Sequence, residues 1–233
     1  GFVNAFFSND AQQEVVNSIL EQGPGYGRSS FGFGKKIHLE YVSANPTGPL
    51  HVGHGRGAAY GASLANVLTA VGYEVHHEYY VNDAGRQMDI LATSVWLRYL
   101  ELCGEEFLFP SAGYLGDYIF DIAASVLRTH ARQFHRPLAD VYFQVPPDQE
   151  QGGDKDEHLD ALIVNAQRLL PASDYRFISD QGLNVILEDI RKDLAEFGIH
   201  YHRWYSELSL SETGKVDQVI DALKQNGSLY EIE

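Results

Sequence analysis

Polar and apolar residues change their pattern three times in the first third of the chain. In residues 36–42 they alternate, which is the period-two pattern of a half-buried strand. Residues 51–71 place apolar side chains at helical spacing, and Gly72 follows where a helix is expected to stop. A second strand is predicted over residues 73–81. This order of strand, helix and strand predicts a βαβ unit, with parallel pairing and a right-handed crossover.

The remainder of the chain is mostly helical in pattern. An amphipathic helix at 11–22 and a glycine-rich loop at 23–34 precede the βαβ unit. Beyond Asn82 we predict helices at 85–102, 116–135, 157–170, 179–197 and 212–225, a loop at 146–153, and strands at 200–206 and 228–233. The predicted fold is therefore α/β, a nucleotide-binding parallel sheet that is interrupted by a mostly helical insertion.

Composition narrows the class of protein. The 233 residues are 44% hydrophobic and 12% aromatic, which supports a real core and excludes a disordered or fibrous chain. The single cysteine, Cys103, excludes a disulfide scaffold and a cysteine-based zinc site, and it favours a reducing compartment. The sequence contains no uninterrupted apolar stretch of membrane-spanning length.

The net charge of −15 argues against binding to nucleic acid or membrane through bulk charge. The charge is uneven, however. Residues 1–80 carry 4 basic and 6 acidic side chains, whereas residues 151–233 carry 8 and 16. A local basic site thus stays possible, and the first third is nearly neutral.

Both ends of the chain suggest a fragment of a longer protein. The sequence begins with Gly1, and its only methionine is Met88. The last residues have the pattern of a strand that lacks a partner.

The segment that follows the first strand has the features of a nucleoside triphosphate site. In open α/β sheets, ligands bind at the carboxyl ends of strands, and phosphates bind at the next helix N-terminus. His51 and His54 are three apart, so both face one side of the first helical turn and can donate to phosphate oxygens. Gly53 between them permits close approach of a flat ring, and Pro46 and Pro49 restrict the loop.

Three other interpretations of the two histidines remain open. They are half of a zinc site, although no third ligand lies at suitable spacing, or they are surface or core residues without a chemical role. The third interpretation is general acid–base catalysis, for which the downstream sequence supplies no obvious nucleophile.

A wider set of motifs resembles one family. His51-Val52-Gly53-His54 matches the HIGH signature of class I aminoacyl-tRNA synthetases. Together with Ser-Ala-Asn-Pro at 43–46 and Gly-Arg-Gly at 55–57, it resembles arginyl-tRNA synthetases in particular. The segments 80–85 and 178–180 are also similar to that family.

The resemblance implies a Rossmann-like catalytic domain of the HUP type, incomplete here, and a two-step reaction. Arginine would attack ATP to give arginyl-adenylate, and the arginyl group would then pass to tRNA(Arg). Mg²⁺ would accompany ATP, with no protein metal site. The resemblance further implies a cytoplasmic enzyme without membrane contact, monomeric at full length. Its parts would be an N-terminal tail and linker at 1–34, the first half of the catalytic domain at 35–110, and the insertion and continuation at 111–233.

The resemblance also implies roles for individual residues. The histidines would be catalytic, and Glu40 would bind the arginine guanidinium unless it pairs with Lys35 or Lys36. Asn82 and Asp83 would line the pocket or cap the helix that follows them. The implied ATP contacts are His51, Gly53 and His54, and the implied arginine contacts are Glu40, Ser43, Ala44, Asn45 and His54.

The chain also departs from the family pattern. It lacks the lysine-rich KMSKS-like loop, later strands and an anticodon-binding domain, so we expect it to be inactive by itself. Two alternatives are a small HxGH nucleotidylyltransferase and a non-catalytic synthetase-like module that binds tRNA or a partner.

One basic feature stands out in the acidic region. Arg128, Arg132 and Arg136 recur at every fourth position on a predicted helix, with His135 beside them. Such a stripe can contact tRNA phosphates, or it can be a solvated face with acidic partners.

Overall fold

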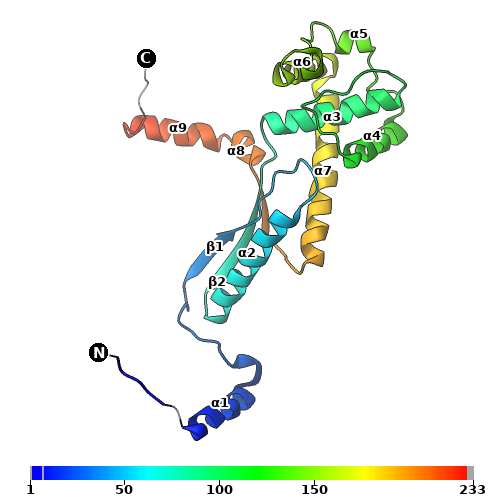
Figure 1. Ribbon diagram of the computed structural model, residues 1–233. Helices are drawn as coiled ribbons and strands as arrows, with labels where there is room; N and C mark the ends of the chain where they lie inside the picture. Colours follow the sequence, from blue (N-terminus) through cyan, green and yellow to red (C-terminus); the bar gives the residue numbers. More distant parts are fainter. Residues whose placement is uncertain (1, 7, 230–233) are drawn as a thin grey trace.

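The computed structural model describes residues 2–6 and 8–229, and Figure 1 shows their arrangement. Its elements, in chain order, are α1 (Asn9–Gln22), η1 (Gly23–Gly25), β1 (Lys36–Glu40), α2 (Val52–Ala70), β2 (Glu74–Val81), α3 (Arg86–Leu102), α4 (Asp117–His130), α5 (Leu138–Val141), η2 (Gln149–Gln151), α6 (Lys155–Leu169), α7 (Ala172–Glu196), β3 (Arg203–Ser206), α8 (Leu208–Glu212) and α9 (Lys215–Gln225). Within this described part, no helix is both long and apolar enough to cross a membrane.

A parallel sheet with strand order β1-β2-β3 forms the centre of the molecule. Helix α2 connects β1 to β2 and buries Ala58, Gly61 and Ala65, so the predicted βαβ unit is confirmed. A side chain at Gly61 would overlap the ring of Tyr41, which lies directly after β1. The small residues of α2 therefore allow the helix to pack closely at the carboxyl end of the sheet.

The helices between β2 and β3 form the main hydrophobic core. Figure 1 shows α3 to α6 gathered at one end of the molecule, and α7 running from there back along the sheet. Trp96 of α3 is almost fully buried, and its indole nitrogen donates to the carbonyl of Phe134 at 2.9 Å. Full burial of a large apolar side chain is worth about 1.5–3 kcal/mol. The insertion formed by these helices is thus a packed unit, and it can fix the position of segments that contact it.

Several predicted boundaries were wrong. Helix α4 ends at His130 rather than at residue 135, because Ala131 adopts φ 48°, in the left-handed region that favours glycine. Helix α7 begins directly after Pro171, several residues earlier than predicted. The helix predicted at 212–225 corresponds to α9, which begins only at Lys215, after Gly214 with φ 66°, while the short helix α8 ends at Glu212. Of the strand predicted at 228–233, residues 228–229 are not in a strand, and the rest lie outside the described residues.

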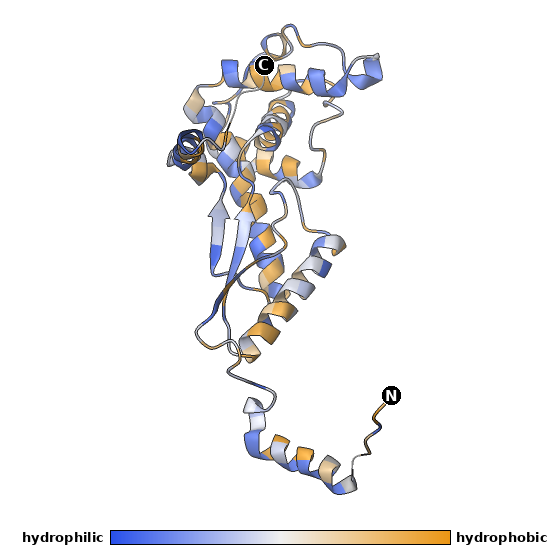
Figure 2. Cartoon of the chain, turned by 90° about the vertical axis from the view of Figure 1, so that its left-hand side faces the viewer, coloured by the Kyte–Doolittle hydropathy of each residue, from blue (hydrophilic) through white to orange (hydrophobic). Residues whose placement is uncertain are grey.

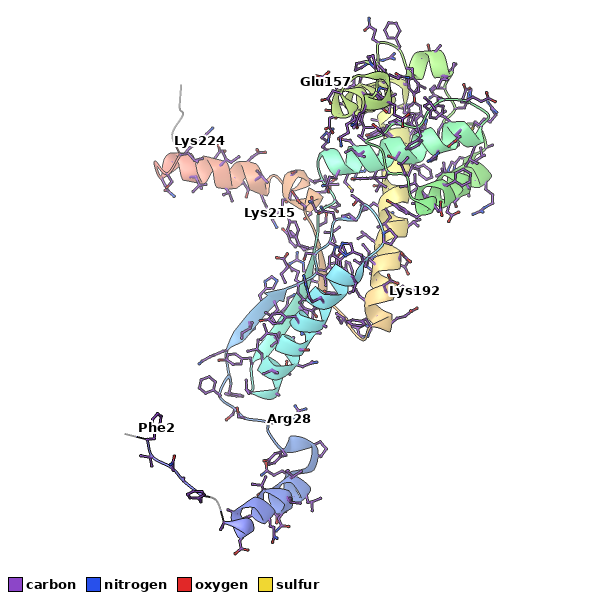
Figure 3. The ribbon with its side chains drawn as sticks, in the orientation of Figure 1. Phe2, Arg28, Glu157, Lys192, Lys215 and Lys224 are labelled. Carbon is purple, nitrogen blue, oxygen red and sulfur yellow. The ribbon has the colours of Figure 1, made fainter. Side chains whose placement is uncertain are left out.

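The first and last helices stand apart from the core. Figure 2 shows apolar positions along α1, and its amphipathic pattern was predicted, but Val16 and Leu20 are exposed. In Figure 3, Lys215 and Lys224 mark the two ends of α9, which extends away from the sheet.

Candidate functional site

The turn after β1 has an unusual backbone conformation. Val42 and Ser43 have φ values of 67° and 40°, a region that residues other than glycine adopt at a cost of about 1–3 kcal/mol each. Contacts from β2 hold this turn. The Ser43 hydroxyl oxygen accepts from the backbone N–H of Tyr80 at 3.0 Å, and the Ala44 carbonyl accepts from the Tyr79 hydroxyl at 3.0 Å. Two of the predicted arginine-site residues are therefore fixed to the neighbouring strand.

Two more tyrosines hold the same loop, and the sequence analysis missed them. The Tyr201 hydroxyl donates to the Tyr41 carbonyl at 2.9 Å, and the Tyr118 hydroxyl donates to the Thr47 carbonyl at 2.5 Å. Burial raises the pKa of all three tyrosines, that of Tyr79 to about 12, so each hydroxyl keeps its proton near neutral pH. The tyrosines come from β2, from α4 and from the segment before β3, and no local pattern relates them to the loop.

The two histidines of the HxGH motif form the N-terminal cap of α2. His51 Nδ1 accepts from the Gly53 N–H at 3.1 Å, and His54 Nδ1 accepts from the His51 N–H at 3.2 Å. Their rings stack with centroids 3.8 Å apart, which confirms that both face the same side. Because both Nδ1 atoms accept, we assign the protons of the neutral rings to Nε2. Burial and the nearby His51 also lower the pKa of His54, which favours the neutral ring.

The glycines of the motif differ in their surroundings. A Cβ at Gly53 would lie 2.8 Å from His51 Cε1, so the flat ring beside Gly53 in this structure is that of His51. In contrast, a Cβ at Gly55 or Gly57 would meet nothing within 4 Å among the described residues. The surface of the first two helical turns is consequently open to a ligand.

Asn45 and Asn82 meet across the carboxyl ends of β1 and β2. The Asn82 side-chain amide donates to Asn45 Oδ1 at 3.1 Å, so the two predicted residues are brought together. Asp83 Oδ1 accepts from the N–H of Leu208, the first residue of α8, at 2.8 Å. The alternative in which Asn82 or Asp83 caps the next helix is wrong, because Gly85 is the N-cap of α3 and no side chain caps it.

Glu40 is exposed at the end of β1. Neither lysine that was considered as its partner pairs with it in the described part of the chain. Lys36 Nζ lies 3.6 Å from Glu74, and Lys35 Nζ lies over the Phe31 ring at 5.2 Å from its centre. The Glu40 carboxylate is thus left for another cation.

A second carboxylate, missed by the sequence analysis, lies beside it. Glu78 is paired with Glu40 across the parallel strands, and its side chain is only 12% exposed. His38 Nε2 lies 3.2 Å and Arg203 Nε lies 3.7 Å from its two oxygens. Glu78 already has cationic or hydrogen-bonding partners, whereas Glu40 has none among the described residues.

The space around the motif is limited by α7 and α4. A small hollow of 150 Å³ lies between His51, Gly55 and Phe197, and a larger hollow of 620 Å³ lies beside Pro49 and Tyr118. Among residues 2–6 and 8–229, no group of three or more His, Cys, Asp or Glu side chains is arranged to hold a metal ion.

The three arginines do not form a helical stripe, so that prediction was wrong. Helix α4 ends before Arg132, which donates to the carbonyl of Cys103 at 2.8 Å. Arg136 donates to the carbonyl of Leu169 at 3.1 Å. Both arginines thus bind helix C-terminal regions, and of the three only Arg128 lies on α4.

Comparison with known proteins decides the family. Residues 15–104 match the model described as tRNA synthetases class I (R), catalytic domain. An arginine–tRNA ligase of Thioalkalivibrio sulfidiphilus is 58% identical over 231 residues, which cover 99% of this chain and 39% of that protein. A second arginine–tRNA ligase, from Hydrogenovibrio crunogenus, is 51% identical over 237 residues, which cover 99% of this chain and 40% of that protein. This chain belongs to the arginyl-tRNA synthetase family.

The structural comparison agrees with this arginyl-tRNA synthetase assignment. A solved structure from Campylobacter jejuni, described as a proposed arginyl-tRNA synthetase, has a TM-score of 0.72 and 27% identity. The match covers 97% of this chain and 42% of that one. The chain therefore spans about two fifths of the length of the synthetases that it matches. The predicted resemblance and the incomplete Rossmann-like fold are confirmed, and the small nucleotidylyltransferase is not favoured.

Proposed function

We propose that this chain supplies the ATP- and arginine-binding part of an arginine–tRNA ligase. In this reaction, a carboxylate oxygen of arginine attacks the α-phosphorus of ATP, pyrophosphate leaves, and arginyl-adenylate forms. The arginyl group then passes to a hydroxyl of the terminal adenosine of tRNA(Arg), and AMP leaves. One observation carries the proposal, namely two stacked imidazoles at the α2 N-terminus whose Nδ1 atoms both accept backbone N–H groups, in a chain 58% identical to an arginine–tRNA ligase.

His51 and His54 stabilise negative charge on the phosphates in this proposal. Their Nε2–H groups donate to phosphate oxygens, and the partial positive charge of the helix N-terminus adds to the attraction. Gly53 and the open surface beyond it admit the adenosine. Neither imidazole has to transfer a proton, because catalysis of this kind consists of positioning and charge stabilisation.

Glu40 binds the arginine guanidinium, because it is exposed and unpaired among the described residues and because carboxylate–guanidinium pairs form two parallel hydrogen bonds. Ser43, Ala44 and Asn45 hold the α-amino and carboxylate groups. Asn45 uses Oδ1 to accept from Asn82, which leaves its side-chain N–H groups for the substrate.

Mg²⁺ binds with ATP in this proposal. It is held by phosphate oxygens and water, the usual arrangement for this ion at nucleotide sites. The remaining parts of the proposal are the division at residues 34 and 110, a contact of Arg128 with tRNA, and a monomeric cytoplasmic enzyme. They rest on the family and on the exposed position of Arg128.

A calorimetric titration of this chain tests the proposal. The ligands are ATP–Mg²⁺ and non-hydrolysable arginyl- and lysyl-adenylate analogues. We expect the arginyl analogue to bind most tightly, and Glu40→Gln to weaken it by about 10- to 100-fold, as for a lost hydrogen bond to a charged group. Glu74→Gln is the matched control, since Glu74 is exposed but lies at the opposite end of the strands. Equal affinity for both analogues, or no binding of any ligand, would overturn the proposal for this chain.

A further inference from the structure

Tyr118, at the start of α4, is wedged between two glycines. Its hydroxyl donates to the Thr47 carbonyl at 2.5 Å. A Cβ at Gly48 would lie 3.0 Å from that hydroxyl oxygen, and a Cβ at Gly116 would overlap the ring. The insertion and the loop before His51 therefore meet at a contact that requires glycine at positions 48 and 116, because a Cβ at either position would crowd the tyrosine.

The other two tyrosine contacts on this loop come from the region of the sheet. Tyr79 belongs to β2, and Tyr201 lies just before β3. They hold the carbonyls of Ala44 and Tyr41, in the first half of the loop. Of the three, only the Tyr118 contact comes from the insertion.

The Tyr118 contact is also the nearest of the three to the HxGH motif. Thr47 is four residues before His51, and Pro49 between them restricts the chain, so movement at Thr47 is transmitted to the helix cap. The position of Tyr118 is itself secured, because Ile119, Ile122 and Val126 of α4 are buried against the core. The hydrogen bond from Tyr118 of α4 can thus restrict the loop between β1 and α2, whose first residues, Val42 and Ser43, have strained backbone conformations.

We propose that Tyr118 is a positioning residue for the candidate nucleotide site, and that through it the helical insertion holds the loop and the imidazoles of His51 and His54 in place. The identity of the positioned ligand rests on the proposed function. The restriction of the loop by Tyr118 does not, and it can be tested without any ligand.

Amide hydrogen exchange of Tyr118→Phe tests the restriction of the loop. The relevant amides are those of Thr47, Gly53 and His54, which are hydrogen-bonded within the loop and the helix cap. We expect these amides to exchange about three- to tenfold faster, as for the loss of one neutral hydrogen bond. Amides in the middle of α4 should keep their exchange rate. Tyr142→Phe is the matched control, because its hydroxyl donates to the Leu108 carbonyl inside the insertion.

A second variant leaves Tyr118 intact. Gly48→Ala places a Cβ against the tyrosine hydroxyl and should accelerate the same amides. Gly25→Ala is its control, because nothing among the described residues lies within 4 Å of the added methyl group. Unchanged exchange in both Tyr118→Phe and Gly48→Ala would overturn the proposal. Equal acceleration by Tyr142→Phe would also overturn it.

Titration with ATP–Mg²⁺ separates the two proposals. If the wild-type chain binds ATP, Tyr118→Phe should weaken binding by about three- to tenfold, whereas Tyr142→Phe should not. Unchanged affinity together with faster exchange would overturn the link between the loop position and the nucleotide site. Absence of binding by the wild-type chain would instead overturn the proposed function for this chain, and the exchange result would still decide whether Tyr118 positions the loop.

Discussion

In the proposed function, His51 combines a structural and a chemical role in one side chain. Its Nδ1 caps α2 by accepting from the Gly53 N–H, and the proton that we assign to Nε2 can be donated to a ligand. The imidazole has two ring nitrogens, so one can accept from the backbone while the other donates to a ligand. The two roles have different requirements, because capping needs only an acceptor near the backbone, whereas phosphate binding needs a donor that extends from the helix.

Substitution of His51 separates these roles. His51→Ala should lower the free energy of unfolding by about 1 kcal/mol, the usual cost of a lost N-cap. His51→Asn should keep most of that stability, because asparagine is among the best N-cap residues. Both variants should lose affinity for ATP–Mg²⁺. Urea unfolding and calorimetry measure the two effects, and equal destabilisation by alanine and asparagine would contradict the capping role.

At the scale of elements, the end of α4 shows how a helix boundary is decided. Ala131 has φ 48° and ψ −128°, nearly the conformation of Gly23 at the end of α1, where φ is 52° and ψ is −130°. An alanine gives no sequence signal for such a conformation. The guanidinium of Arg132 then reaches the carbonyl of Cys103, the C-cap residue of α3. This contact supplies a cation at a helix C-terminus, where it is favourable.

Arg132→Ala should therefore lower the free energy of unfolding by about 1–2 kcal/mol, since it removes a hydrogen bond from a charged donor at a partly solvated site. Arg128→Ala is the control. Among the described residues, its guanidinium donates a hydrogen bond only to the Ser125 hydroxyl on its own helix, so we expect a change within about 0.5 kcal/mol. Chemical unfolding of the two variants compares them. A larger loss of unfolding free energy in Arg128→Ala than in Arg132→Ala would contradict the stabilising role of the contact between Arg132 and the C-terminus of α3.

At the scale of the whole molecule, histidines from all three strand regions meet at the sheet. The rings of His76 and His202 stack at 5.2 Å, and His38 lies against His76 at 5.6 Å. His77 donates its backbone N–H to His202 Nδ1 at 2.9 Å, and its own Nδ1 lies 3.0 Å from the Tyr41 hydroxyl. Burial, followed by the proximity of His202 and His76, lowers the pKa of His77 below its usual value of 6.5.

We expect the lowered pKa of His77 to make the stability of the chain depend on pH. Because the pKa of His77 is lower in the folded state, the unfolded chain binds the proton first as the pH falls. Stability should be highest above about pH 6.5 and should decrease below that value. His77→Gln should make the decrease shallower, and His200→Gln, which lies outside the cluster, should not. Urea unfolding between pH 5 and pH 8 measures the slopes, and a steeper decrease in His77→Gln would contradict this account.

The sequence by itself determined the features that depend on near neighbours along the chain. The βαβ unit follows from local periodicity, and the shared face of His51 and His54 follows from their three-residue spacing. The family follows from the contiguous motif around them, and the comparisons confirm it. Such features need no knowledge of the rest of the fold, because each follows from residues that are near neighbours along the chain.

Only the tertiary structure decided which distant groups complete the site. Tyr118 and Thr47 are 71 residues apart, and Glu78 and Arg203 are 125 apart. The end of α4 at His130 and the hydrogen bond from the Leu208 N–H to Asp83 likewise differ from what the sequence predicted. For the side-chain contacts, the physical reason is the same in each case. A hydroxyl, carboxylate or guanidinium can form a hydrogen bond with many different groups, and the local sequence does not favour one of them. Only the packing of the core brings one particular partner within hydrogen-bond distance.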